Sequence, residues 1–169
     1  NSPPRLEKLA GTLAAHERSL EYDDLDAVCE DISEFLHRDY GLLDCLRKGV
    51  IYHHGSVPDV VKLFIEELYS VIPGMRYIVS SSTLLEGVNI PAEKLFLLEC
   101  KKGPSNLTAS QFKNLVGRVC RFGEIFSDFA GSLHLLEPEI YIIASGYIHK
   151  NANIENFIRD RVKVDKKIK

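Results

Sequence analysis

The feature that most constrains the fold is an alternation of short apolar runs with amphipathic helical patterns. The apolar runs, which predict buried strands, are residues 49–55, 76–80, 94–100 and 139–145. Helical patterns separate these runs or flank them, and such an order is typical of an α/β domain with a mainly parallel sheet. Ligands of these sheets bind at the carboxyl ends of the strands, which directs attention to the residues that follow each run.

The helical segments carry recognisable boundaries. We expect helices over residues 3–18 and 27–47, the second with a break near Gly41 and with Phe35 facing inward. Ser56 and Asp59 match a capping box for the next helix, whose predicted inner stripe is Val61, Phe64, Ile65 and Leu68. Thr108 and Gln111 match a second box, and a last helix is expected after Asn153.

Composition limits the function classes. The 169 residues carry 21 basic and 24 acidic side chains, so any nucleic-acid contact must be local rather than driven by bulk charge. No apolar run approaches the roughly 20 residues that span a bilayer. The cysteines lack metal-binding spacing and are expected to be reduced, buried thiols of a cytoplasmic, intracellular protein. We expect one domain over residues 1–150 and a terminal helix or connector over 151–169.

A hydroxyl-rich segment at residues 80–91 follows the second predicted strand. Its run of serines and a threonine can donate hydrogen bonds to phosphate oxygens without carrying charge. Gly87 permits close backbone approach, and Asn89 offers both a donor and an acceptor. On composition alone, a hydroxyl-rich turn before a helix explains the same residues.

The predicted helix at residues 108–121 has two distinct faces. Phe112, Leu115, Val116 and Val119 form the apolar stripe. Asn114, Arg118 and Arg121 fall on the opposite side, where paired guanidinium groups suit a phosphate ligand and equally suit a solvated basic face. Gly117 is costly within a helix and predicts close packing of a neighbour.

His53 and His54 are adjacent at the end of the first predicted strand. Successive strand residues point to opposite faces, so the two rings are not expected to share a metal. One buried histidine and one at the strand end is the expectation. The chain also lacks a phosphate-binding P-loop, a dinucleotide-binding glycine motif and a nucleophile elbow, so no route to nucleotide hydrolysis by this chain alone is evident.

Three segments in order resemble one known family. Residues 50–55 (VIYHHG), 81–92 (SSTLLEGVNIPA) and 114–121 (NLVGRVCR) resemble the stretch before motif five, motif five and motif six of superfamily-two DEAD/DExH-box helicases. The resemblance is to the second, C-terminal RecA-like domain and covers about residues 1–145. It implies a three-layer RecA-like fold with a mainly parallel sheet, whose first strand is expected to be missing from this chain.

The resemblance also implies roles for individual residues. Arg118 and Arg121 would be arginine fingers that reach ATP, which is held with Mg²⁺ mainly by a first RecA-like domain absent from this chain. The nucleotide-side residues would be Gly87, Asn89 and Asn114. The residues expected to contact the nucleic-acid backbone are Ser81, Thr83, Gly55, His54 and Lys62.

Two function classes follow from this reading. The first is the second motor domain of an ATP-dependent helicase or translocase, partnered by nucleic acid and by the first RecA-like domain. The alternative is a catalytically silent RecA-like module for binding or assembly, whose arginines serve a protein partner. DNA and RNA remain equally open as partners.

Overall fold

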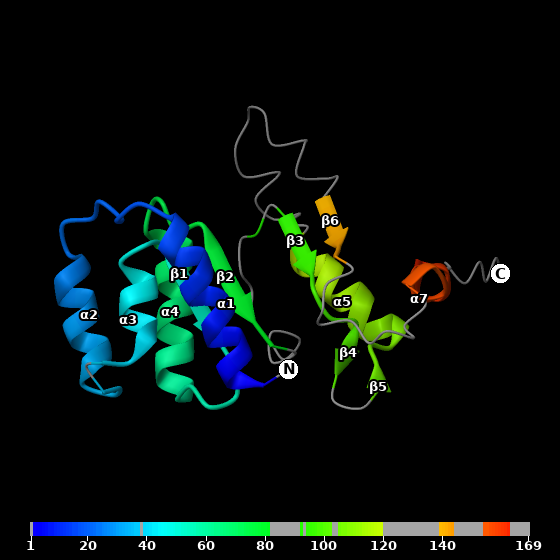
Figure 1. Ribbon diagram of the computed structural model, residues 1–169, viewed down its shortest axis with the longest axis horizontal. Coiled ribbons are helices and arrows are strands. Elements are labelled where there is room, and N and C mark those ends of the chain that lie inside the picture. The colour runs from blue at the N-terminus through cyan, green and yellow to red at the C-terminus, as the bar shows by residue number, and fades with distance from the viewer. Residues whose placement is uncertain are drawn as a thin grey trace. The chain divides into compact units, whose positions relative to one another are not determined.

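The computed structural model describes residues 2–37, 39–81, 92, 94–102, 105–119, 139–143 and 154–162. The chain divides into two compact units, Asn1–Ile90 and Pro91–Lys169. Both units combine helices with short parallel strands, so the expected α/β class is confirmed (Figure 1). Among the helices that the structure describes, none has the length and apolar character needed to cross a bilayer.

The first unit is built around one pair of parallel strands. Its elements are α1 (Pro3–His16), α2 (Leu25–Ser33), α3 (Gly41–Leu46), β1 (Val50–His53), α4 (Asp59–Val71) and β2 (Tyr77–Ser80). The parallel register places Val50 beside Tyr77 and His53 beside Ser80. Because parallel neighbours cannot be joined by a tight turn, the chain crosses over through α4 between the two strands.

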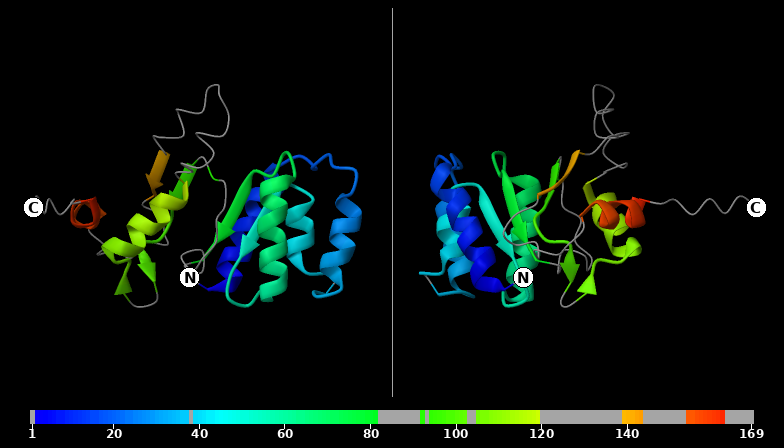
Figure 2. Two further views of the ribbon diagram at one scale, coloured as in Figure 1. Left: turned by 180° about the vertical axis from the view of Figure 1, so that it is seen from behind. Right: turned by 45° about the vertical axis from the view of Figure 1, so that its right-hand side comes forward.

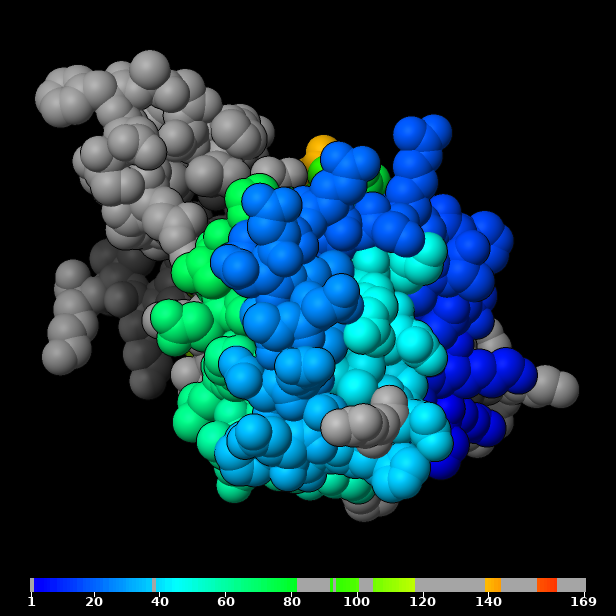
Figure 3. Space-filling view, turned by 90° about the vertical axis from the view of Figure 1, so that its left-hand side faces the viewer, coloured from blue at the N-terminus to red at the C-terminus, as the bar shows by residue number. Residues whose placement is uncertain are grey.

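Helices cover both faces of this strand pair. α1 and α3 pack on one face and α4 on the other, as the front and rear views show (Figures 1 and 2). The resulting core is tightly closed, since Ile51 and Ile65 are both 0% exposed and Tyr52 is 1% exposed. α2 lies farther out, against α3, with α4 along one of its sides and α1 beyond the other (Figure 3).

The expected break near Gly41 is confirmed, because α2 ends at Ser33 and α3 begins at Gly41. The expected inward position of Phe35 is wrong, since this residue lies between the two helices with 57% of its surface exposed. Beyond α2, the Asp39 backbone N–H donates to the His37 Nδ1 at 3.2 Å. A local side-chain acceptor of this kind competes with the helical backbone bond and favours a turn.

The expected capping box before α4 is also wrong. α4 begins at Asp59, Pro58 occupies the cap position with an extended ψ of 142°, and no side chain caps the helix. The Ser56 N–H donates to His54 instead. Within α4, Val61, Ile65 and Leu68 are buried as expected, whereas Phe64 is 36% exposed.

The second unit contains a parallel strand pair and a small hairpin. Its elements are β3 (Lys94–Leu97), β4 (Lys101–Lys102), β5 (Ser105–Asn106), α5 (Ala109–Val119), β6 (Glu139–Ile142) and α7 (Ile154–Val162). β3 pairs in parallel with β6, and β4 pairs antiparallel with β5. The sequence patterns did not predict this hairpin. α5 packs against β3 and against α7.

The start of α5 confirms the second capping box. The Gln111 N–H donates to the Thr108 Oγ1 at 3.2 Å, and the Thr108 N–H donates to the Gln111 Oε1 at 2.9 Å. These reciprocal bonds satisfy backbone donors that a helix start leaves without partners. The rings of Phe112 and Phe157 meet edge to face at 5.7 Å and join α5 to α7. The predicted domain boundary at residue 150 and the expected missing strand stay predictions.

Candidate nucleic-acid interface

The carboxyl ends of β1 and β2 lie side by side because the two strands run parallel. The Ser81 N–H, directly after β2, donates to the carbonyl oxygen of His53 at 3.1 Å. Ser80 donates its hydroxyl to the Ser81 carbonyl oxygen at 3.0 Å. The segments that follow the two strands are therefore tied together at one edge, where α/β folds place their ligands.

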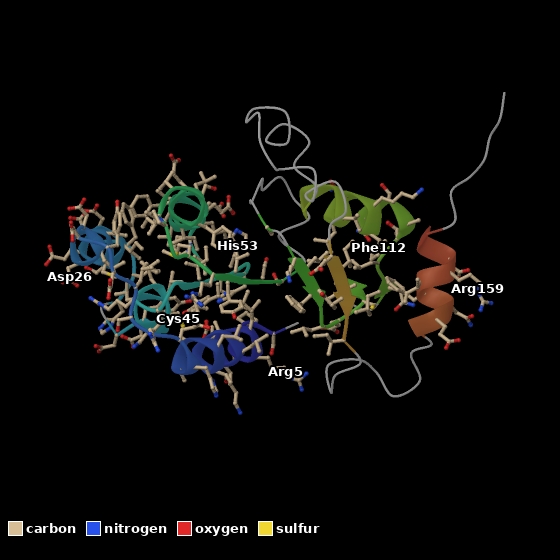
Figure 4. All side chains as sticks on the ribbon, turned by 90° about the horizontal axis from the view of Figure 1, so that it is seen from above. Arg5, Asp26, Cys45, His53, Phe112 and Arg159 are labelled. Atoms are coloured by element: carbon tan, nitrogen blue, oxygen red, sulfur yellow. The ribbon has the colours of Figure 1, made fainter. Side chains whose placement is uncertain are left out.

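His53 faces α4. Its Nε2 lies 2.9 Å from the Glu66 Oε1, and the two side chains are 4% and 13% exposed (Figure 4). Burial lowers the pKa of His53, and the positive charge of Lys62 lowers it further. A backbone hydrogen bond and the Asp59 carboxylate oppose this shift, but the net pKa lies below the ordinary value, so His53 is mainly neutral at neutral pH.

His54 faces the other side of the strand pair, toward α1. Its Nε2 lies 3.0 Å from the Glu7 Oε1, and its Nδ1 accepts a hydrogen bond from the Ser56 N–H at 3.2 Å. Because Nδ1 is an acceptor here, we assign the ring proton to Nε2, which donates to Glu7. The ring also stacks on Tyr52, with centroids 5.6 Å apart and planes 6° apart.

The expected opposite orientation of the two histidines is confirmed, but the expectation that only one is buried is wrong. His53 is 4% exposed and His54 is 1% exposed. Each ring reaches a carboxylate on a different helix, which removes it from solvent. His54 was expected to contact nucleic acid; its side chain instead supports the following loop from inside.

Three other residues expected to contact nucleic acid lie at this edge. Gly55 is exposed, and no heavy atom lies within 4 Å of where a Cβ would be. Ser81 is half-buried beside the end of β1. The Lys62 ammonium lies 2.8 Å from the Asp59 carboxylate, with 15% of the Lys62 side chain exposed. The structure thus gathers Gly55, Ser81 and Lys62 around the end of β1.

The helix expected to carry the arginines is α5. Phe112 and Leu115 are buried whereas Asn114 is exposed, so the predicted division of the helix into two faces is confirmed at these positions. The expected close packing at Gly117 is wrong, because no described heavy atom lies within 4 Å of where a Cβ on Gly117 would be.

Several predicted site residues fall outside the described part of the chain. They are Thr83, Gly87, Asn89, Arg121 and the side chain of Arg118. Within the described ranges, no group of three histidine, cysteine or acidic side chains could hold a metal ion.

Sequence reasoning missed the two carboxylates that hold the histidines. Glu7 lies on the same helical stripe as the buried Ala10 and Ala14, and this spacing was a usable signal for an inward-facing acid. Glu66 neighbours the buried Ile65. A carboxylate beside an apolar stripe is a natural partner for a buried histidine.

Comparison with known proteins finds a DNA polymerase and several proteins named as helicases. The chain is 35% identical to DNA polymerase theta of Caenorhabditis elegans over 91 residues, which are 51% of this chain and 5% of that protein. It is 29% identical to a helicase POLQ-like protein of the same organism over 119 residues, 68% of this chain and 13% of that protein. It is 28% identical to the ATP-dependent DNA helicase Hel308 of Thermoplasma acidophilum over 112 residues, 63% of this chain and 16% of that protein.

The search of protein-family models finds no match. The chain spans only between 5% and 16% of the lengths of these relatives. The similarity to POLQ-like and Hel308 proteins, over these partial lengths, supports a helicase-family relationship.

Proposed function

We propose that this chain is the second RecA-like motor domain of an ATP-dependent nucleic-acid helicase or translocase. The observation that carries the proposal is the similarity to helicases over up to 68% of the chain. The order of the motif-five and motif-six segments favours the second domain over other parts of such a protein. The parallel β1–α4–β2 arrangement supports it, because the motif-five segment begins directly at the carboxyl end of β2.

In this proposal the end of the first strand pair grips the nucleic-acid backbone. Gly55, Ser81 and Thr83 supply backbone and hydroxyl donors, and Lys62 adds a positive charge. Contacts of this kind position a strand without reading its sequence. The small net negative charge of the chain, −3, also suits a local contact rather than an extended basic surface.

In this proposal the exposed face of α5 takes part in ATP hydrolysis. Asn114 lies on the side opposite the buried Phe112 and Leu115, and Arg118 and Arg121 continue the same stripe by spacing. This donor set fits a polyphosphate. ATP, held with Mg²⁺ mainly by a first RecA-like domain, would supply the phosphoryl group, and the two arginines would stabilise the negative charge that develops during its transfer.

The test is the ATPase rate of the full-length protein, with and without single-stranded DNA or RNA, in wild type and Arg121→Ala. Loss of an arginine finger lowers turnover by about 10³-fold while ATP binding largely survives. Lys113→Ala is the matched control, because Lys113 is an exposed basic residue of the same helix outside the arginine stripe. That variant is expected to retain the wild-type rate.

Other results would change the assignment. An Arg121→Ala protein with wild-type, nucleic-acid-stimulated turnover would remove Arg121 from the mechanism and leave Arg118 as the candidate. A wild-type protein that binds nucleic acid but never hydrolyses ATP would favour the catalytically silent RecA-like module.

A further inference from the structure

The loop after β1 is held by a continuous chain of hydrogen bonds that starts on α1. The Glu7 Oε1 lies 3.0 Å from the His54 Nε2 and accepts a second bond from the Tyr40 hydroxyl at 3.3 Å. The His54 Nδ1 then accepts the Ser56 N–H at 3.2 Å. A side chain that accepts the backbone N–H two residues later fixes a turn, as asparagine and aspartate do in Asx-turns.

This chain of bonds brackets one exposed residue. Gly55 lies between His54 and Ser56, and the Val57 N–H donates to the His54 carbonyl oxygen at 3.1 Å to close the turn. Val57 is 2% exposed, so the far end of the loop is anchored in the core. The Gly55 N–H itself has no acceptor among the described residues. Among the described residues, the loop therefore presents one backbone donor without a protein acceptor at its tip.

The first residue after β2, Ser81, is bonded to His53, whose side chain lies on the opposite side of the strand pair from His54. His53 contacts Glu66 of α4 and, through its carbonyl oxygen, accepts the Ser81 N–H. His54 thus bonds the loop after β1 and His53 bonds the first residue after β2, and each histidine contacts a carboxylate of a different helix. Preorganised donors bind a phosphate more tightly than mobile ones because less conformational entropy is lost on binding.

We propose that Glu7 and His54 are positioning residues that hold the Gly55 N–H ready to donate to a nucleic-acid phosphate. The inference rests on the proposed function, and it gives His54 a role behind the interface rather than in it. The buried imidazole shapes the loop, and Gly55 makes the contact.

The test compares His54→Ala with His54→Asn in the full-length protein. The asparagine side-chain oxygen can accept the Ser56 N–H in an Asx-turn, whereas alanine cannot. The probes are labelled single-stranded DNA and RNA oligonucleotides, with binding followed by fluorescence anisotropy. We expect His54→Ala to raise the dissociation constant about tenfold, the worth of one hydrogen bond to a charged phosphate, and His54→Asn to raise it by less than about threefold.

A second measurement reports on the loop without reference to nucleic acid. Exchange of the Ser56 amide hydrogen is expected to speed up in His54→Ala and to stay near wild type in His54→Asn. Ile32→Val is the control for lost core packing, because Ile32 is 0% exposed in α2. It is expected to lower stability and to leave both oligonucleotide affinity and Ser56 exchange unchanged.

The outcomes separate this inference from the proposed function. Faster Ser56 exchange with unchanged oligonucleotide affinity in His54→Ala would overturn the positioning role while leaving the helicase assignment intact. No binding of either oligonucleotide by wild type would overturn both, and the exchange data would still show whether His54 holds the loop. If His54→Ala fails to fold, Glu7→Ala against Glu7→Gln makes the same comparison at a side chain that is 38% exposed.

Discussion

The backbones of Gly49 and Gly74 approach so closely that Gly49 has no room for a side chain. A Cβ on Gly49 would lie 2.7 Å from the Gly74 carbonyl oxygen, and both residues have positive φ, 70° and 92°. The Gly49 carbonyl oxygen also accepts the Arg76 N–H at 2.8 Å. This contact joins the start of β1 to the chain entering β2 and sets the register of the pair.

Gly49→Ala is therefore expected to destabilise the protein. The strained φ and the overlap with a backbone oxygen together cost about 2 kcal/mol or more in the free energy of unfolding. Urea unfolding of the two proteins measures the difference. Gly11→Ala is the matched control: Gly11 lies in α1 with nothing within 4 Å of a Cβ, so alanine there is expected to stabilise the helix slightly. Equal stability of Gly49→Ala and wild type would contradict the close approach.

Because His53 is buried, we expect the folded protein to lose stability in mild acid. The pKa of His53 lies below 6.5 in the folded protein, first because it is buried and second because Lys62 is near, with His54 adding to the shift and a backbone hydrogen bond and Asp59 opposing it. In the unfolded chain the ordinary pKa returns, so below about pH 6.5 the unfolded state binds more protons. The stabilising contribution is present above that pH and is lost as pH falls, by up to about 1.4 kcal/mol per pH unit.

The measurement is urea unfolding at several pH values between 8 and 5 in wild type and His53→Gln. The variant cannot titrate at this position, so its stability should fall less steeply with acid. Identical pH slopes in the two proteins would show that His53 carries no such shift.

Cys45 should be inert in the folded protein. Burial, with a smaller effect of the Asp44 carboxylate, raises the pKa of its thiol to about 11. At pH 8 only about one thiol in 10³ is then ionised, and the side chain is 4% exposed. Alkylation with iodoacetamide, followed by peptide mass spectrometry, is expected to be on the order of 100-fold slower than in urea. Rapid native labelling would mean that α3 opens readily.

The capping box of α5 offers a local test. Thr108→Ala removes the acceptor for the Gln111 N–H and is expected to cost about 1 kcal/mol, whereas Thr108→Ser retains it. Hydrogen exchange of the first-turn amides of α5 should rise in the alanine variant alone. Equal protection in both variants would show that the hydroxyl contributes nothing to the helix start.

Sequence patterns predicted those elements whose signals are local. The apolar run around Ile51 became a buried strand, and the Thr108–Gln111 box formed because both partners lie within one turn. The predicted inward position of Phe35 was wrong. The side chain of His37 bonds the backbone of Asp39, and a pattern of helical spacing does not take such competing bonds into account. Patterns of helical spacing report which residues could share a face but not where the helix ends.

Sequence patterns predicted only part of the candidate site. Alternation along a strand predicted that His53 and His54 face opposite ways. Their partners could not be predicted, because Glu7 and His54 are 47 positions apart and meet only once α1 packs on β1. Burial of the His54 ring follows from that packing and burial of the His53 ring from the packing of α4, rather than from the residues themselves.

The parallel pairing of β1 and β2 also constrains the order of events during folding. The strands cannot meet until the intervening chain has looped back, so the entropy of closing that loop is lost before the strand bonds form. Docking of α4 through the fully buried Ile65 offsets this loss. Ile65→Val should therefore slow refolding in stopped-flow measurements, whereas a variant that only unfolds faster would mean that the strands pair before the helix docks.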